Sequence, residues 1–431
     1  MLELFNHFIR RYHFLSLLIA LIVTNNVLSV GLPLGMAYYG IIFGALVLLL
    51  LSGGLETMRW PYFVFLLVCV ISIVFNNVPD LFQPWMRLAL FAIAMALFSP
   101  MMQSSLLRRF RIETFVIILY LQLVVVIFSA FAPLFGVETA YNGIGNRGIT
   151  THLMILGPIA GMGMIFCVYQ LWVQQTENRS KAARWLYFIM AFLSFVLMVS
   201  STSRIAVIST AAGCVALILY KARFKADRTL MYAFILATIV GGSYPFWGKY
   251  SIEVIAKQEA AMMKGGSFGT RTHLWKERIN EFRSSPYIGI GFAAVAGVDD
   301  TRSVIAPTKK HSYRFRGLNR RDNQSLTATS IGKDGKVETG SGWLLVLSMT
   351  GLAGAVLFIS FMITALRKSI LMVRRSNSDP FCLLGALLIF LAVHMIAEGY
   401  TLAGGSYMFV ILWLLLGAID AWGKEPKEIT F

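Results

Sequence analysis

Three arginines are candidates for chemistry: Arg147 in GNRGITTH and Arg204 in SSTSRIAV, which lie beside long hydrophobic stretches, and Arg271 in the polar segment GTRTHLWKER. Charged side chains at membrane depth are costly and tend to mark function. Two guanidinium groups on one side of a membrane can bind a diphosphate and stabilise it as a leaving group. Each arginine also has a simpler explanation: Arg204 can snorkel from a helix end, Arg271 can pair with Glu277, and Arg147 can be a surface charge.

A carboxylate, Glu338, opens the motif ETGSGWLLVLSMTGLAG directly before another hydrophobic stretch. It can take a proton from an attacking hydroxyl group as a general base, or it can be an acid that favours the positive end of a helix dipole. Four further residues are supporting candidates, as rival bases or neighbours of the site: His152, Trp275, His311 and Ser341. His394 and Glu398 can form a polar pair that faces a helix bundle. The adjacent Asp299 and Asp300 are weak grounds for a metal site, and we expect none.

The elements that must hold these residues are membrane spans. Of the 431 residues, 57% are hydrophobic, and they fall in continuous runs of about 18 to 25 residues, the length that crosses a bilayer. The four cysteines lie inside such runs and are interpreted as packing residues. The sequence therefore predicts an all-α, polytopic membrane protein of about 12 transmembrane helices. The expected spans are 14–31, 33–52, 60–77, 84–101, 114–136, 151–172, 185–200, 203–222, 230–247, 342–366, 381–398 and 405–422.

The distribution of Lys and Arg predicts the orientation. If the N-terminus is cytoplasmic, every cytoplasmic connector carries a basic residue, from Arg10 and Arg11 to Lys424 and Lys427. The short outer connectors 78–83, 137–150, 201–202 and 399–404 carry none apart from Arg147. This asymmetry follows the positive-inside rule, so both termini are expected in the cytoplasm. The first run is interpreted as a retained span and not a removed signal peptide.

A long polar stretch, 248–341, separates nine expected spans (1–247) from three (342–431) and is expected outside the membrane. It carries sixteen basic and nine acidic residues in a chain of net charge +17. A basic outer loop attracts an anionic ligand, although a solvated surface of mixed charge also explains it. Short helices are predicted at 252–264 and 270–283, followed by turns at SSPY and GIG. No structure is assigned to 297–337.

Taken together and in this order, NRGITTH, STSRIAV, GTRTHLWKE, SPYIGIGF and ETGSGWLLVLSMTGLAG resemble the O-antigen ligase and O-antigen polymerase superfamily. The resemblance covers roughly residues 140 to 365 in motifs and the whole chain in topology. It implies an all-helical bacterial inner-membrane glycosyltransferase with a large periplasmic loop. It also implies that Arg204 and Arg271 hold the diphosphate of a lipid-linked donor, and that Arg147 matches a further arginine of the family.

The implied reaction transfers a glycan from undecaprenyl diphosphate to an acceptor at the periplasmic face, without a metal or another cofactor. Glu338 takes the position where ligases of the family carry a histidine, as it does in members similar to exopolysaccharide and capsule polymerases. Polymerisation of a surface polysaccharide is therefore favoured, and ligation of the glycan to lipid A-core is the alternative. The implied partners are the lipid-linked glycan, a glycan or lipid A-core acceptor, the bilayer and a chain-length-regulating copolymerase, but no nucleic acid.

A lipid-linked glycan transporter, or flippase, is the competing hypothesis from another class. Secondary transporters often consist of two repeated halves with charged residues near the membrane centre. Here the expected spans divide nine and three around the long loop, residues 1–215 and 216–431 show no repeat, and the charges gather at one face. These features favour the enzyme.

Overall fold

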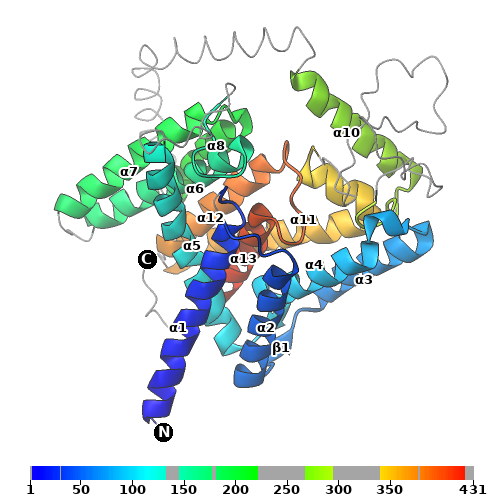
Figure 1. Ribbon diagram of the computed structural model, residues 1–431, viewed down its shortest axis with the longest axis horizontal. Coiled ribbons are helices and arrows are strands. Elements are labelled where there is room, and N and C mark those ends of the chain that lie inside the picture. Colours follow the sequence, from blue (N-terminus) through cyan, green and yellow to red (C-terminus); the bar gives the residue numbers. More distant parts are fainter. Residues whose placement is uncertain are drawn as a thin grey trace.

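The protein is built almost entirely from helices. The computed structural model describes residues 2–29, 31–132, 145–176, 181–221, 267–294, 340–376 and 379–422. The helices are α1 (Leu2–Asn25), α2 (Met36–Gly53), α3 (Trp60–Asn76), η1 (Asp80–Phe82), α4 (Pro84–Phe98), α5 (Ser105–Phe131), α6 (Leu153–Thr176), α7 (Lys181–Ser200), α8 (Arg204–Lys221), α10 (Ser267–Ser284), α11 (Gly342–Ser376), α12 (Asp379–His394) and α13 (Tyr407–Trp422). The strands β1 (Thr57–Met58) and β2 (Met102–Gln103) form one short antiparallel pair. Figure 1 shows α13 near the middle of the helices.

Each described α-helix except α10 overlaps one expected span, although α1 begins 12 residues and α5 nine residues before the expected start, and α11 ends ten residues after the expected end. Five helices among the described residues are long and apolar enough to cross a membrane: α2, α5, α6, α7 and α11. Helices α1, α3, α4, α8, α12 and α13 contribute shorter apolar segments. The expected span 230–247 and the expected helix 252–264 lie outside the described residues, so the total of about 12 spans stays a prediction. The helix predicted at 270–283 is confirmed as α10.

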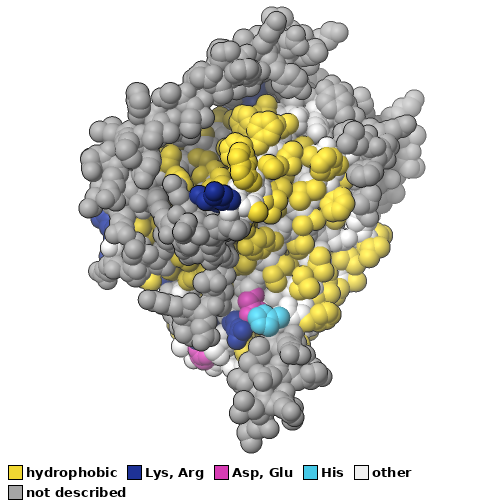
Figure 2. All heavy atoms as spheres, turned by 90° about the vertical axis from the view of Figure 1, so that its left-hand side faces the viewer, with side chains coloured by type: hydrophobic (Ala, Val, Ile, Leu, Met, Phe, Trp, Pro, Cys, Tyr) yellow, Lys and Arg dark blue, Asp and Glu magenta, His cyan; other side chains and the backbone are white. Residues whose placement is uncertain are grey.

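Aromatic packing around α13 forms the centre of the bundle. Trp413 is fully buried, and its ring contacts Phe65 of α3, Phe91 of α4 and Phe358 of α11. Helix α7, in contrast, exposes a row of large apolar side chains, which includes Trp185, Leu186, Phe188, Ile189 and Phe192. Figure 2 shows a broad hydrophobic surface on the side of the molecule where α7 lies. An exposed apolar surface of this extent suits contact with lipid chains.

Glycines of the segment GPIAGMG bring α6 close to its neighbours. A Cβ on Gly157 would collide with Ser203 at the start of α8, and a Cβ on Gly161 would collide with Thr210 of α8. Small residues of this kind let helix backbones approach closely where lipid cannot drive association. They hold the start of α8 against the start of α6.

The ends predicted to be cytoplasmic are joined by ion pairs. Asp420 at the end of α13 accepts a hydrogen bond from Arg59 at 2.7 Å and lies 3.7 Å from the Lys368 ammonium. Glu56 pairs with Arg108 at 2.8 Å. The hydrogen bond from Arg108, followed by that from the Ser105 amide, lowers the pKa of Glu56 below its usual value. Connectors expected on one side therefore do meet at one end of the bundle.

Helix α11 is kinked at Gly351, where φ is +62°. The turn after α10 packs into this kink: the Ile290 amide donates to Ser348 O at 2.8 Å, and the Leu352 amide donates to Pro286 O at 2.8 Å. Ser72 Oγ of α3 donates to Met349 O at 2.6 Å. Backbone groups freed by a kink in a membrane helix must find such partners. The turn after α10 is thus fixed to a break in a span.

Replacing Gly289 with alanine is expected to destabilise the protein by more than about 1 kcal/mol. Gly289 has a φ of +73°, and an added Cβ would collide with the backbone of Met349 and Thr350. The measurement is the midpoint of thermal unfolding in detergent. Gly44→Ala in α2, where an added Cβ would meet no atom within 4 Å, is the matched control and should leave the midpoint unchanged or raised.

Candidate active site

The three residues before and at the start of α11, Gly340, Ser341 and Gly342, connect separate parts of the chain. Trp275 Nε1 of α10 donates to Gly340 O at 3.2 Å. The Ser341 hydroxyl and the Gly342 amide both donate to Met395 O, directly after α12, at 3.1 and 2.8 Å. We call these residues the 340–342 junction. It joins the loop helix α10, the start of α11 and the end of α12.

The packing of α8 against α12 places Arg204 at the same end of the bundle. A Cβ on Gly213 of α8 would touch Ala386 O of α12, and a Cβ on Gly385 would collide with the Tyr220 ring. A Cβ on Gly161 of α6 would also meet both Thr210 of α8 and Phe390 of α12, so residue numbers fall along α12 as they rise along α8, and the two helices are antiparallel. Extending this register back to the first residue of α8 puts Arg204 level with the end of α12. Arg204 is partly buried there.

The segment 145–152 carries Arg147 against the turn that precedes Arg204. The Asn146 amide donates to Ser200 O at 2.9 Å, and an added Cβ on Gly145 would collide with the Thr202 side chain. The Thr150 amide and hydroxyl both donate to Arg147 O, at 3.0 and 2.7 Å, which fixes the local turn. The motifs NRGITTH and STSRIAV, which begin 55 residues apart in sequence, at 146 and 201, are therefore neighbours.

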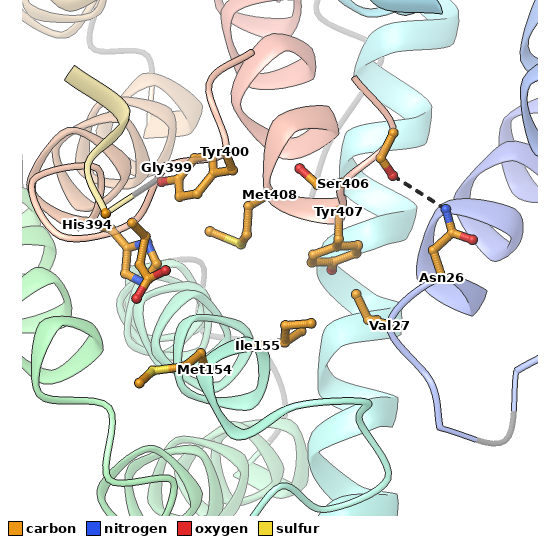
Figure 3. Close-up of a pocket in the computed structure, with 13 residues that line it drawn as sticks. Asn26, Val27, Met154, Ile155, His394, Gly399, Tyr400, Ser406, Tyr407 and Met408 are labelled. Carbon is orange, nitrogen blue, oxygen red and sulfur yellow. Dashed lines mark hydrogen bonds between the residues drawn. The ribbon is translucent and has the colours of Figure 1, made fainter. Parts of the chain in front are cut away.

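A cavity of about 450 Å³ opens beside these elements. Its wall includes Gly340 of the 340–342 junction, Val27 after α1, Ile155 of α6 and Tyr407 of α13. Figure 3 shows how these elements surround the space, with His394 and Tyr400 on one side and Asn26 on the other. The Thr151 amide donates to Val27 O at 2.8 Å, so the segment of Arg147 adjoins the same wall. We call this space the first cavity.

The predicted arginines and the predicted base are described to different extents. Arg147 and Arg204 are placed as above, both partly buried. Arg271 lies on α10 one helical turn before Trp275, but its side chain lies outside the described residues. Glu338 and His311 are also outside them, Glu338 by two residues from Gly340. Contact between Arg204, Arg271 and Glu338 therefore stays a prediction.

The supporting candidates make local structural contacts. His152 is exposed, and its Nδ1 accepts a hydrogen bond from the Met154 amide at 3.1 Å, so it caps the start of α6. The Ser341 side chain is buried and donates to Met395 O. Trp275 is partly buried and ties α10 to Gly340. All three position the backbone around the first cavity.

Two pairs of polar residues outside the motifs of the resemblance line the first cavity or are buried in the structure. His394 and Glu398 both line the first cavity, and His394 is buried between the rings of Phe390 and Tyr400 at centroid distances of 5.7 Å. In the sequence, the signal for this pair is two titratable residues four positions apart at the end of a hydrophobic run. The second group, a buried ion pair of Arg278 and Glu281 at 2.7 Å, gives no such signal because i,i+3 pairs are common on exposed helices.

Replacing Trp275 with phenylalanine is expected to lower turnover by up to about tenfold, because a lost hydrogen bond of about 0.5–1.5 kcal/mol loosens α10 from the 340–342 junction. The measurement is the rate of product formation at saturating substrate. Trp185→Phe, at an exposed position on α7, is the control and should have wild-type activity. Equal rates in both variants would contradict a positioning role for Trp275.

Comparison with known protein families matched residues 186–359 to the O-antigen ligase family. The matched region contains most of α7, all of α8 and α10, the 340–342 junction and the kink of α11. A search among curated proteins found no match. The resemblance seen in the motifs is thereby confirmed, and the family is one of glycosyltransferase-like membrane enzymes that act on lipid-linked glycans. Residues 186–359 match the O-antigen ligase family, and this match supports the resemblance of the chain to the O-antigen ligase and O-antigen polymerase superfamily.

Proposed function

We propose that the protein is an inverting, metal-independent glycosyltransferase that polymerises a surface polysaccharide. Its donor is a glycan linked to undecaprenyl diphosphate, and it works at the periplasmic face of the bacterial inner membrane with both termini in the cytoplasm. The observation that carries the proposal is the 340–342 junction. The junction bonds α10, the helix of Arg271, to Gly340, which lines the first cavity two residues after Glu338, and it bonds Ser341 to Met395 directly after α12.

In this mechanism Glu338 accepts the proton of an acceptor hydroxyl as that oxygen attacks the anomeric carbon of the donor. The bond between the anomeric carbon and the diphosphate oxygen breaks on the opposite face, so the configuration inverts. Arg204 and Arg271 neutralise the charge that grows on the leaving diphosphate, with Arg147 as a third cation. The phosphates remain with the lipid, and the glycan is transferred to the acceptor.

The test is turnover by the purified protein in nanodiscs with a lipid-linked oligosaccharide as both donor and acceptor. We expect lipid-linked products longer by whole repeat units, together with free undecaprenyl diphosphate. Movement of intact donor across a vesicle membrane without new glycosidic bonds would instead indicate the flippase and overturn the proposal.

The description of the matched family as O-antigen ligase favours a second candidate function. In it the same site transfers the glycan to lipid A-core. Adding lipid A-core to the same reaction distinguishes the two. A polymerase does not use lipid A-core, whereas a ligase glycosylates it and does not lengthen the lipid-linked chains.

A further inference from the structure

The loop helix α10 lies at the periphery of the molecule (Figure 1) and has one buried side. Leu274, Arg278 and Glu281 share that side, because a rotation of about 100° per residue brings positions three or four apart together. All three side chains are buried, and a Cβ on Gly340 would collide with Leu274. This side therefore faces the 340–342 junction, which fixes the directions in which the two flanks of α10 point.

One flank of α10 is apolar and the other is polar. Trp275, Ile279 and Phe282 follow one another at spacings of four and three residues, so they form a stripe along one flank, which we call the α10 stripe. Ile279 is exposed, and the other two side chains are partly exposed. The other flank carries Glu277, Asn280 and Ser284. An accessible apolar flank beside a polar one is typical of a helix that lies in the interface of a membrane.

The turn after α10 adds an exposed aromatic ring to this surface. The Tyr287 side chain is 76% exposed, although its backbone is held in place. The Ala353 amide donates to Tyr287 O at 3.3 Å, and the Leu352 amide donates to Pro286 O at 2.8 Å. Gly351 permits this close approach, since an added Cβ would collide with the Tyr287 carbonyl group. The exposed ring is therefore mounted beside the first residues of α11 after its kink.

After the kink, α11 presents a row of exposed apolar side chains at helical spacing: Leu352, Val356, Ile359 and Ile363. The row lies on a helix that is long and apolar enough to cross a membrane. From Leu352 to Arg374, at the end expected in the cytoplasm, the helix rises about 33 Å at ~1.5 Å per residue, and the hydrocarbon core is about 30 Å thick. In that orientation Leu352 lies at the outer edge of the core and Tyr287 lies near the headgroups, where aromatic rings are enriched.

We propose that α10 is an interfacial helix whose apolar flank rests on the outer lipid leaflet. The α10 stripe contacts the boundary between headgroups and acyl chains, and Tyr287 anchors the end next to α11. The partner is the phospholipid bilayer, because Tyr287 joins the stripe to the lipid-facing row of α11. The contact is apolar, so it does not require Lys276 and Arg283, two exposed cations of α10. This inference goes beyond the proposed function, because the bilayer sets the height of α10 whatever the reaction.

The test measures how deeply single sites of the full chain lie in nanodiscs of phosphatidylcholine. Nitroxide labels on Ile279→Cys, Asn280→Cys and Leu352→Cys report collisions with oxygen, which concentrates among acyl chains, and with a nickel chelate, which stays in water. The four native cysteines are buried or partly buried, and the unsubstituted chain gives their background. We expect the label at 279 to favour oxygen several-fold more than its neighbour at 280 on the polar flank, and to approach the label at 352.

A label at 279 that collides mainly with the nickel chelate overturns the proposal, because the flank then faces water. A label that neither reagent reaches overturns it too, because protein then covers the flank. A preference for oxygen that appears only when phosphatidylglycerol is added would assign the contact to the cations and overturn the apolar one.

Tyr287→Glu tests the anchor at an exposed position, where the substitution leaves the core intact. Combined with Ile279→Cys, it should lower the preference of the label for oxygen several-fold, whereas Tyr287→Trp, which keeps an amphipathic ring, should retain it. An unchanged depth in Tyr287→Glu would overturn the anchoring role. None of these measurements requires turnover, so their outcome is independent of whether the protein polymerises a glycan.

Discussion

Replacing Glu338 with glutamine is expected to lower the rate of glycan transfer by about 10²–10⁴, the usual contribution of a general base. Glutamine has nearly the same shape but cannot accept the proton of the attacking hydroxyl. The measurement is product formed per enzyme at saturating donor and acceptor. Asp80→Asn, an exposed acid in the expected outer connector before α4, is the control and should leave the rate unchanged.

Glu338→His is a second test of the general base, because the resemblance implies a histidine at this position in ligases of the family. A glutamate of ordinary pKa, about 4.3, is deprotonated and active throughout neutral pH, whereas a histidine of about 6.5 loses activity as the pH falls through that value. The variant should therefore retain part of the activity, with the acidic limb of its pH–rate profile moved upward by about two units. An unmoved profile would show that Glu338 is not the base.

Replacing Arg271 with alanine is expected to reduce transfer by about 10²–10³, while expression and thermal stability are unchanged. The physical reason is that charge on the leaving diphosphate is greatest in the transition state, so its cation affects kcat more than substrate binding. Arg271→Lys should recover only part of the loss, because an ammonium group cannot form the paired contacts of a guanidinium.

Arg283→Ala is the matched control for Arg271, because both arginines lie on α10 and Arg283 is exposed. It should have wild-type activity. Comparable losses in the two variants would point to the net charge of α10, and full activity of Arg271→Ala would refute its assignment to the diphosphate.

Much of the helical architecture follows from the sequence because the hydrophobic runs are long and their ends are marked. The expected spans 60–77 and 84–101 correspond to α3 and α4, with Pro61 at the second position of α3 and Pro84 at the first position of α4. The segment 270–283 has helical spacing of Leu274, Ile279 and Phe282, and it forms α10. Local periodicity suffices for such elements.

Contacts between distant segments could not be predicted in the same way. Gly351 lies in an apolar run that predicts a continuous span, and the backbone groups around its kink are hydrogen-bonded to residues 286–290, over 60 positions earlier. Arg87 lies inside the expected span 84–101, because a single charged residue does not lower the hydropathy of the whole stretch enough to interrupt it. Whether such a residue faces lipid or a cavity is decided by tertiary packing, which no single stretch of sequence records.

The kink at Gly351 and the bond from Trp275 to Gly340 have a consequence for variation among related enzymes. One fastens the chain before residue 295 to α11, and the other fastens α10 to the chain after residue 339. The helix bundle therefore fixes the residues on either side of the chain between 295 and 339. We expect insertions and deletions between residues 295 and 337 to leave the position of the 340–342 junction on the bundle unchanged.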